Sequence, residues 1–186
     1  TSAGEPYDVY AVDLDGDGDM DVLSASARDN TIAWYNNNGS ESFTADNITT
    51  DAGSASSVYA TDVDGDGDMD VLSASMSDDK IAWYRNDGSE NFSPFNVNTP
   101  DPDGGGSEQG NADWPYSVYA VDLDGDGDID VLSASNLDDK IAWYENDGSE
   151  SFTATTIATS ADGAHDVYAV DLDGDGDMDV LSASYN

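Results

Sequence analysis

The chain has 186 residues and is extremely acidic, with 41 Asp and Glu residues against 4 Lys and Arg residues and a formal net charge of −37. So few basic residues exclude nucleic acid and anionic membrane surfaces as partners, and no apolar run is long enough to predict membrane insertion. Charge of this density opposes compaction, whereas 38% hydrophobic and 10% aromatic residues indicate a folded core, so we expect bound cations.

An internal repeat organises the sequence. A block that begins Tyr-Ala-Val-Asp-Leu-Asp-Gly-Asp-Gly-Asp at Tyr10 returns, with small changes, from Tyr59, Tyr119 and Tyr168. After each of the first three copies comes Ile-Ala-Trp-Tyr, then Asn-Asn-Gly-Ser or Asn-Asp-Gly-Ser, then a segment that begins with Phe. We therefore predict one repeat domain, 1–186, with repeats at about 7–50, 57–98, 117–159 and 166–186 and a surface-loop insertion at 99–115.

Each complete repeat is predicted to contain four short strands, which in the first repeat are 9–12, 21–26, 31–35 and 43–49. These segments are rich in Val, Ile, Tyr, Trp and Thr, and the Asn-Asp-Gly-Ser sequence is a strong turn signal. No segment has helical periodicity. Four short strands per repeat of this length are typical of a propeller blade. We therefore predict an all-β, β-propeller-like array of four-stranded blades, three complete and one half.

The loop between the first two strands of each repeat carries the chemistry. Its pattern, Asp-x-Asp-x-Asp-Gly-x-x-Asp, places carboxylates at positions one, three, five and nine and a glycine at the sharp bend. Position seven is expected to offer its backbone carbonyl. Ca²⁺ takes about 6–8 oxygen ligands of this kind, so we predict one ion per loop. The apolar residue at position eight is expected to point inward and anchor the loop; these residues are Met20, Met69, Ile129 and Met178.

Two other interpretations of the loop are weaker. An EF-hand needs Glu at position twelve and flanking helices, but this position holds Ser24, Ser73, Ser133 or Ser182 and the flanks are strand-like. Solvated acidic turns of a salt-adapted surface would not require the same five Asp residues in all four copies. Clustered carboxylates also repel one another, so we expect ion binding to be coupled to folding.

These motifs resemble the FG-GAP and VCBS repeats of secreted bacterial proteins and of integrin α-subunit propellers, over nearly the whole chain apart from the insertion. The resemblance implies that each repeat is a propeller blade whose first hairpin loop binds Ca²⁺, giving four ions per chain. The Phe-Gly and Gly-Ala-Pro signatures of the integrin repeats are absent, so the bacterial type is the closer likeness. The implied metal ligands are Asp13, Asp15, Asp17, Asp19 and Asp21; Asp62, Asp64, Asp66, Asp68 and Asp70; Asp122, Asp124, Asp126, Asp128 and Asp130; and Asp171, Asp173, Asp175, Asp177 and Asp179.

The aromatic residues have two interpretations. The Trp-Tyr pairs of the second block, such as Trp34-Tyr35, are expected to pack between blades, although they could stack on sugar rings. Trp114 and Tyr116, which we place in or beside the insertion, are better positioned to contact a ligand. His165 is the only histidine and lacks Cys, Ser or acid partners at a recognisable spacing, so we interpret it as structural.

The sequence predicts a protein that is not an enzyme, because it contains no pair of base and nucleophile and because protein oxygens should saturate each ion. Propellers of this family close with about six to eight blades, and the half repeat leaves an unpaired strand edge at 180–184. Three arrangements stay open: a four-bladed ring with one thin blade, a fragment of a longer propeller, and an open array completed by neighbouring copies. We expect self-association, with a head-to-tail filament as one form. The predicted function is an extracellular, secreted or cell-surface, calcium-binding structural or adhesive repeat protein. The alternative is a lectin-like module that binds glycans; a Ca²⁺-assisted polysaccharide lyase is the weakest candidate.

Overall fold

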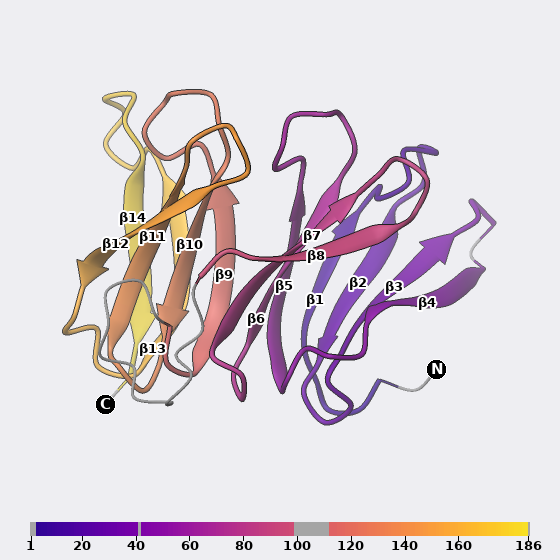
Figure 1. Ribbon diagram of the computed structural model, residues 1–186, viewed down its shortest axis with the longest axis horizontal. Helices are drawn as coiled ribbons and strands as arrows, with labels where there is room; N and C mark the ends of the chain where they lie inside the picture. Colours follow the sequence, from indigo (N-terminus) through magenta and orange to yellow (C-terminus); the bar gives the residue numbers. More distant parts are fainter. Residues whose placement is uncertain (1–2, 41, 99–111, 186) are drawn as a thin grey trace.

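The computed structural model describes residues 3–40, 42–98 and 112–185, and every regular element within these ranges is a β-strand (Figure 1). Fourteen strands form three four-stranded sheets and one two-stranded sheet, all antiparallel. No helix long and apolar enough to cross a bilayer is found in the described part of the chain. The all-β prediction is therefore confirmed.

The first sheet contains β1 (Pro6–Val12), β2 (Asp21–Ser26), β3 (Thr31–Asn37) and β4 (Phe43–Thr49), hydrogen-bonded in that order. All four predicted strands are present, and the first begins three residues earlier than predicted. The second and third sheets repeat the order with β5 (Ala55–Thr61), β6 (Asp70–Ser75), β7 (Lys80–Asn86) and β8 (Phe92–Asn96), then β9 (Pro115–Val121), β10 (Asp130–Ser135), β11 (Lys140–Asn146) and β12 (Phe152–Ala158).

The fourth sheet holds only β13 (Ala164–Val170) and β14 (Asp179–Ser184), as the half repeat predicts. Strand pairing has the same register in every first hairpin, where the last residue of the first strand faces the first Asp of the second strand. The pairs are Val12 with Asp21, Thr61 with Asp70, Val121 with Asp130 and Val170 with Asp179. This shared register closes four loops of equal length, so each Asp has the same place in all four.

The sheets pack side by side through their first strands, with β5 against β1, β9 against β5 and β13 against β9 (Figure 1). Buried side chains fill the space between them, as where Leu23 and Trp34 of the first sheet meet Val58 of the second. Equivalent tyrosines also form a row through all four sheets, with ring centroids 4.8, 5.1 and 4.7 Å apart, made of Tyr10, Tyr59, Tyr119 and Tyr168. The repeats thus fit the arrangement of blades, but the row is open and does not close into a ring.

The longer spacing between the second and third repeats arises before residue 112. Residues 99–111 of the predicted insertion lie outside the described residues. Trp114 has the left-handed backbone conformation (φ 56°) that Ser54 has in the second repeat (φ 52°), and each carbonyl accepts a hydrogen bond from the loop after the second strand. Pro115 and Tyr116 belong to β9. The predicted insertion therefore extended too far at its C-terminal end, because the local repeat structure already resumes by Trp114.

Candidate metal centres

The four Asp-rich loops lie along one edge of the row of sheets, where each joins the first two strands of its sheet (Figure 1). Each loop brings three carboxylate groups together, with one oxygen from each within 4.8 Å of the others. In the first three loops the carboxylates come from positions one, three and five. In the fourth they come from positions one, three and nine. The groups are Asp13, Asp15 and Asp17; Asp62, Asp64 and Asp66; Asp122, Asp124 and Asp126; and Asp171, Asp173 and Asp179.

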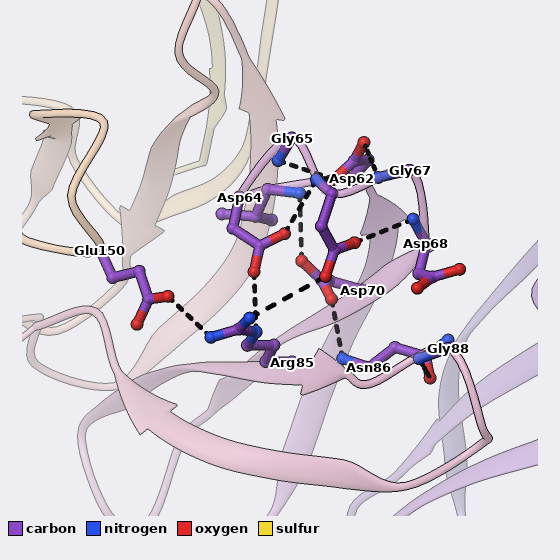
Figure 2. A network of polar contacts seen from close by, with 12 residues as sticks. Asp62, Asp64, Gly65, Gly67, Asp68, Asp70, Arg85, Asn86, Gly88 and Glu150 are labelled. Carbon is purple, nitrogen blue, oxygen red and sulfur yellow. Dashed lines mark hydrogen bonds and ion pairs between the residues drawn. The ribbon is translucent and has the colours of Figure 1, made fainter.

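The loop backbone holds these carboxylates in place, as the second loop shows (Figure 2). Asp62 accepts hydrogen bonds from the N–H groups of Gly65 (2.8 Å), Asp66 (3.1 Å) and Gly67 (2.9 Å), and Asp66 accepts one from Asp68 (3.0 Å). Gly65 and Gly67 have φ angles of 74° and 97°, a region that favours glycine. The bond from position six to position one recurs in the other loops, from Gly18 to Asp13, Gly127 to Asp122 and Gly176 to Asp171.

The Asp at position nine fixes the loop to its sheet. Asp21 is fully buried, and its Oδ1 accepts a hydrogen bond from Asn37 N–H at the end of β3 (2.7 Å). Its Oδ2 accepts bonds from Leu14 N–H (3.2 Å) and from the Trp34 indole (3.0 Å). The same two backbone bonds join Asp70 to Val63 and Asn86, and Asp130 to Leu123 and Asn146. In these three loops, the position-nine Asp therefore joins the loop backbone to the end of the third strand and is not a member of the three-carboxylate group.

Burial governs the electrostatics of this position. It raises the pKa of Asp70 to about 6, against the opposing effect of the N–H groups of Asn86 and Val63, and it raises the pKa of Asp130 in the same way. Asp179 of the fourth loop is exposed and accepts a bond from Leu172 N–H (3.0 Å). Without a third strand to hold it, Asp179 groups with Asp171 and Asp173 instead.

The Asp at position seven contacts the turn between the third and fourth strands. In the second sheet, the Asp68 carboxylate lies so close to Gly88 (φ 72°) that a Cβ atom at Gly88 would clash with it. The same contact joins Asp19 to Gly39 and Asp128 to Gly148. No position-seven carboxylate is a member of the described groups, which leaves the backbone carbonyl as the ligand that the sequence predicts for this position.

The prediction for position eight is wrong in three of the four loops. Met20 is 55% exposed, and Met69 and Met178 are also exposed, while Ile129 is partly buried and packs against the core. The first two loops are instead anchored by position two, where Leu14 is 2% exposed and Val63 is buried, whereas Leu123 is partly buried and Leu172 is exposed. In these two loops the position-nine carboxylate accepts a hydrogen bond from the N–H group of position two, from Leu14 to Asp21 and from Val63 to Asp70. This bond orients the position-two side chain toward the core.

The carboxylate groups fit a hard cation. Each group supplies oxygen donors alone, which is the donor set that Ca²⁺ prefers. Asp13 Oδ1 is buried and has no hydrogen-bond partner among the described residues. A buried acceptor without a partner is costly, and a bound cation would satisfy it. Burial also raises the pKa of Asp64, although a hydrogen bond from Asp66 and the charge of Arg85 lower it. An ion bound among these oxygens would remove the cost of burying them.

Sequence reasoning missed the residue that contacts position three from the third strand. This residue follows the Trp-Tyr pair and differs in each complete repeat. In the first repeat Asn36 donates a hydrogen bond from Nδ2 to Asp15 (2.6 Å), and in the second Arg85 Nε lies 2.7 Å from Asp64 Oδ2. In the third repeat the equivalent residue is Glu145. The signal was present as a position, directly after the constant Ile-Ala-Trp-Tyr block, that holds Asn, Arg or Glu.

The aromatic residues divide as the packing interpretation expected. Of the three Trp-Tyr pairs, Trp34, Trp83, Tyr84 and Tyr144 are buried, which confirms that they belong to the core, whereas Tyr35 and Trp143 are only partly buried. Trp114 is partly exposed beside the start of β9. Beside it the partly buried Tyr116 and the exposed His165 and Tyr185 form a short row, in which the ring centroid of His165 lies 4.5 Å from that of Tyr116 and 5.7 Å from that of Tyr185.

A lectin of known structure resembles this fold, and a biofilm matrix protein gives a weaker match. A lectin from Agrocybe aegerita, described as specifically recognising non-reducing terminal N-acetylglucosamine, is 20% identical with a TM-score of 0.61, and the match covers 94% of this chain and 46% of the lectin. The V. cholerae biofilm matrix protein Bap1 is 18% identical with a TM-score of 0.39, over 88% of this chain and 30% of that protein. The chain thus spans less than half of either protein, and the lectin shares its fold.

Sequence comparison identifies the repeats directly. No curated protein matches the sequence. The profile of the FG-GAP-like repeat, however, matches residues 13–73, 62–133 and 122–182, so that successive matches overlap and run through all four Asp-rich loops. These matches cover most of the chain and confirm the resemblance that the loop motif and the Ile-Ala-Trp-Tyr block indicate. The chain therefore belongs to the FG-GAP-like repeat family.

Proposed function

We propose that the protein is an extracellular, calcium-binding repeat module with a structural or adhesive role. The observation that carries the proposal is the set of four oxygen-only carboxylate groups, one at the same place in each repeat. Each loop would hold one Ca²⁺, so four ions bind per chain. The triads supply the carboxylate oxygens, position seven supplies a backbone carbonyl, and position nine of the fourth loop supplies Asp179.

Electrostatics explain why an ion would stabilise the fold. Two unit charges 4 Å apart repel by about 1 kcal/mol in water and by about 4 kcal/mol at an effective dielectric constant of 20. Each loop gathers three carboxylates at about this spacing above a buried fourth one in the first three loops. A bound divalent cation would neutralise this charge and stabilise the closed loop. Its binding energy would then add to the free energy of unfolding of the sheets that the loop joins.

The proposed role is non-catalytic and outside the cell. Loop oxygens that saturate the ion leave no open position for a substrate or an activated water. Extracellular modules bind Ca²⁺ with dissociation constants of about 10⁻⁴–10⁻³ M, which suits the concentration outside cells. A surface with 41 acidic residues also suits a protein that works in salty or calcium-containing water. In such a module the stacked sheets would serve as blades of a propeller-like array.

We further propose that the module associates head to tail with a second copy of itself. The support is that the two ends of the row expose positions that neighbouring sheets bury inside it. Val9 on β1 is 64% exposed, whereas its equivalent Val58 on β5 is 2% exposed because it packs on the first sheet. At the other end, Leu181 on β14 is 39% exposed, whereas its equivalent Leu72 is fully buried. A β1 strand of one copy on the β13–β14 face of another would repeat the packing that already joins the sheets.

Metal analysis tests the calcium proposal. The protein, dialysed against millimolar CaCl₂ and then gel-filtered in the same buffer, should carry four calcium ions per chain above the buffer level. Asp122→Asn, which alters position one of the third loop, should lower this number to three. Asp46→Asn, on the exposed face of β4, removes the same charge outside the loops and should leave it at four. A wild-type protein with no bound calcium would contradict the proposal.

Glycan binding is a second candidate, and one observation favours it. Trp114 is partly exposed at the edge of the third sheet, two residues before Tyr116, which begins the aromatic row that continues with the exposed His165 and Tyr185. Exposed aromatic faces stack on the apolar faces of sugars. If this surface is a lectin site, a glycan array should show binding that Trp114→Ala abolishes, and Phe95→Ala, at an exposed aromatic residue of β8, should not affect it.

A further inference from the structure

Arg85 distinguishes the second loop from the others. It lies on β7, and its guanidinium is held between two sheets (Figure 2). Nε is 2.7 Å from Asp64 Oδ2 and Nη2 is 3.9 Å from Asp66 Oδ2, so Arg85 contacts two of the three carboxylates in the second group. On the other side, Nη1 is 2.7 Å from Oε1 of Glu150, which belongs to the turn after β11. A positive charge of the protein itself thus lies at a predicted cation site.

The corresponding residues of the other repeats form an internal comparison. Asn36 is neutral and donates a hydrogen bond to Asp15, so the first loop has the same contact without the charge. Glu145 holds the corresponding position on β11 and is acidic, so the third repeat has a negative charge where the second has a positive one. The fourth loop has no third strand beside it in this chain. The four loops therefore share a motif and differ in charge at one neighbouring position.

On the basis of the proposed function, we infer that Arg85 is a built-in cation that makes the second loop the weakest calcium site and links this loop to the third sheet when no ion is bound. The guanidinium neutralises part of the charge on Asp64 and Asp66 and repels an arriving Ca²⁺. By the same reasoning, the third loop, beside Glu145, should bind more tightly than the first. Residues on the third strand would thus grade the affinities of otherwise similar sites.

The link to the third sheet has independent support. Asn146, at the end of β11, donates from its side chain to the carbonyl of Val63 in the second loop (3.4 Å). The second loop and the turn that carries Glu150 also line a shared cleft of about 240 Å³, with Arg85 between them. Glu150 is exposed and pairs with Nη1 of Arg85, a different nitrogen from the two that face Asp64 and Asp66. The ion pair with Glu150 could therefore persist in both states.

Substitution of Arg85 should strengthen calcium binding at the second loop and should destabilise the chain when no ion is bound. Arg85→Asn gives the second loop the residue of the first, and it should tighten calcium binding there about tenfold, the scale of a charge repulsion near 1.4 kcal/mol. In EDTA, the same variant should melt at a lower temperature than the wild type, because the second group loses its only described counter-charge. A residue that merely packs would lower the melting temperature equally with and without Ca²⁺.

A calcium titration followed by ¹⁵N amide spectra of the full chain tests each loop separately. The Gly67 amide reports the second loop and the Gly18 amide reports the first. In the wild type, Gly67 should shift at about tenfold higher Ca²⁺ than Gly18, and in Arg85→Asn the two should shift together. The reciprocal variant Asn36→Arg should move the Gly18 transition to higher Ca²⁺. Glu150→Gln serves as a control that keeps the Arg85 charge beside the loop.

The outcomes separate this inference from the proposed function. If neither amide responds to Ca²⁺, the calcium proposal itself fails. If both shift together in the wild type, or if Arg85→Asn leaves the Gly67 midpoint unchanged, the calcium sites stand and the role of Arg85 is refuted. A lower melting temperature of Arg85→Asn in both EDTA and Ca²⁺, with no change in midpoint, would assign Arg85 a purely structural role and would also overturn the inference.

Discussion

The second and fourth sheets have nearly the same sequence in their first hairpins and yet lie in very different surroundings. Strand β6 reads Asp-Val-Leu-Ser-Ala-Ser and is buried along its whole length, whereas β14 has the same six residues and is mostly exposed. The loops themselves differ little, since Asp62 and Asp171 accept the same backbone bonds from Gly67 and Gly176. The motif thus determines the loop, and the neighbouring sheet determines what the motif contributes to stability.

Leucine substitutions should reveal the largest difference between these sheets. Leu72→Ala removes a fully buried side chain from the space between the second and third sheets, and it should lower the free energy of unfolding by about 2–5 kcal/mol. Leu181→Ala, at the same place in the fourth sheet, should cost less than about 1 kcal/mol because this side chain is already partly exposed. Urea unfolding in Ca²⁺ measures both. At protein concentrations low enough to keep the chain monomeric, equal costs would contradict the exposure of Leu181.

The second-largest difference in stability between the second and fourth sheets is expected at the position-nine carboxylates, Asp70 and Asp179. Asp70→Ala leaves the N–H groups of Val63 and Asn86 without their acceptor in a buried place, which should cost about 1–3 kcal/mol. Asp179→Ala exposes only the Leu172 N–H group to solvent and should have a smaller effect on urea unfolding in EDTA. In Ca²⁺, however, Asp179→Ala should weaken ion binding at the fourth loop, where Asp179 is a member of the carboxylate group.

Loop glycines should show how similar the two hairpins are. Gly65 and Gly174 have φ angles of 74° and 81°, and no atom lies within 4 Å of a Cβ built at either position. Replacing either glycine by Ala should therefore cost only the backbone strain, about 1 kcal/mol, and the same in both sheets. Thermal melting compares the two variants directly. A much larger cost at Gly65 would show that the neighbouring sheet also constrains the loop backbone.

The smallest effect on the stability of the single chain is expected at the exposed N-terminal face. Val9→Lys should change the free energy of unfolding by less than about 0.5 kcal/mol, because Val9 is exposed in the isolated chain. It should nevertheless abolish head-to-tail association, which light scattering coupled to gel filtration measures in Ca²⁺. Val167→Lys, at the equivalent buried position of β13, is the control for a side chain that a neighbouring sheet already covers. A wild-type protein that is monomeric at all concentrations would refute the association.

The features that depend on short-range pattern were predictable from the sequence. The spacing of Asp and Gly, together with Val-rich flanks, predicted the strands and the grouping of the carboxylates at positions one and three in every loop, because the hairpin is formed by residues adjacent in sequence. Position nine was also predicted to be a ligand, but in the first three loops it lies outside the group because it bonds to backbone N–H groups of its own sheet. The direction of Met20 was predicted wrongly, because it depends on the bond from Leu14 to Asp21 beneath the loop. The contact of Arg85 with Glu150 joins residues of different sheets, so no local pattern could reveal it.

The most direct test of the account is the stability of the purified chain with and without its ions. Circular dichroism and thermal melting should be recorded in millimolar CaCl₂, and again after exhaustive treatment with EDTA, with MgCl₂ as a control. If the four loops bind Ca²⁺ at about ten times their dissociation constants, chelation should lower the melting temperature by about 10 °C or more. A β-sheet spectrum and a melting temperature that remain unchanged in EDTA would contradict the claim that calcium holds these sheets together.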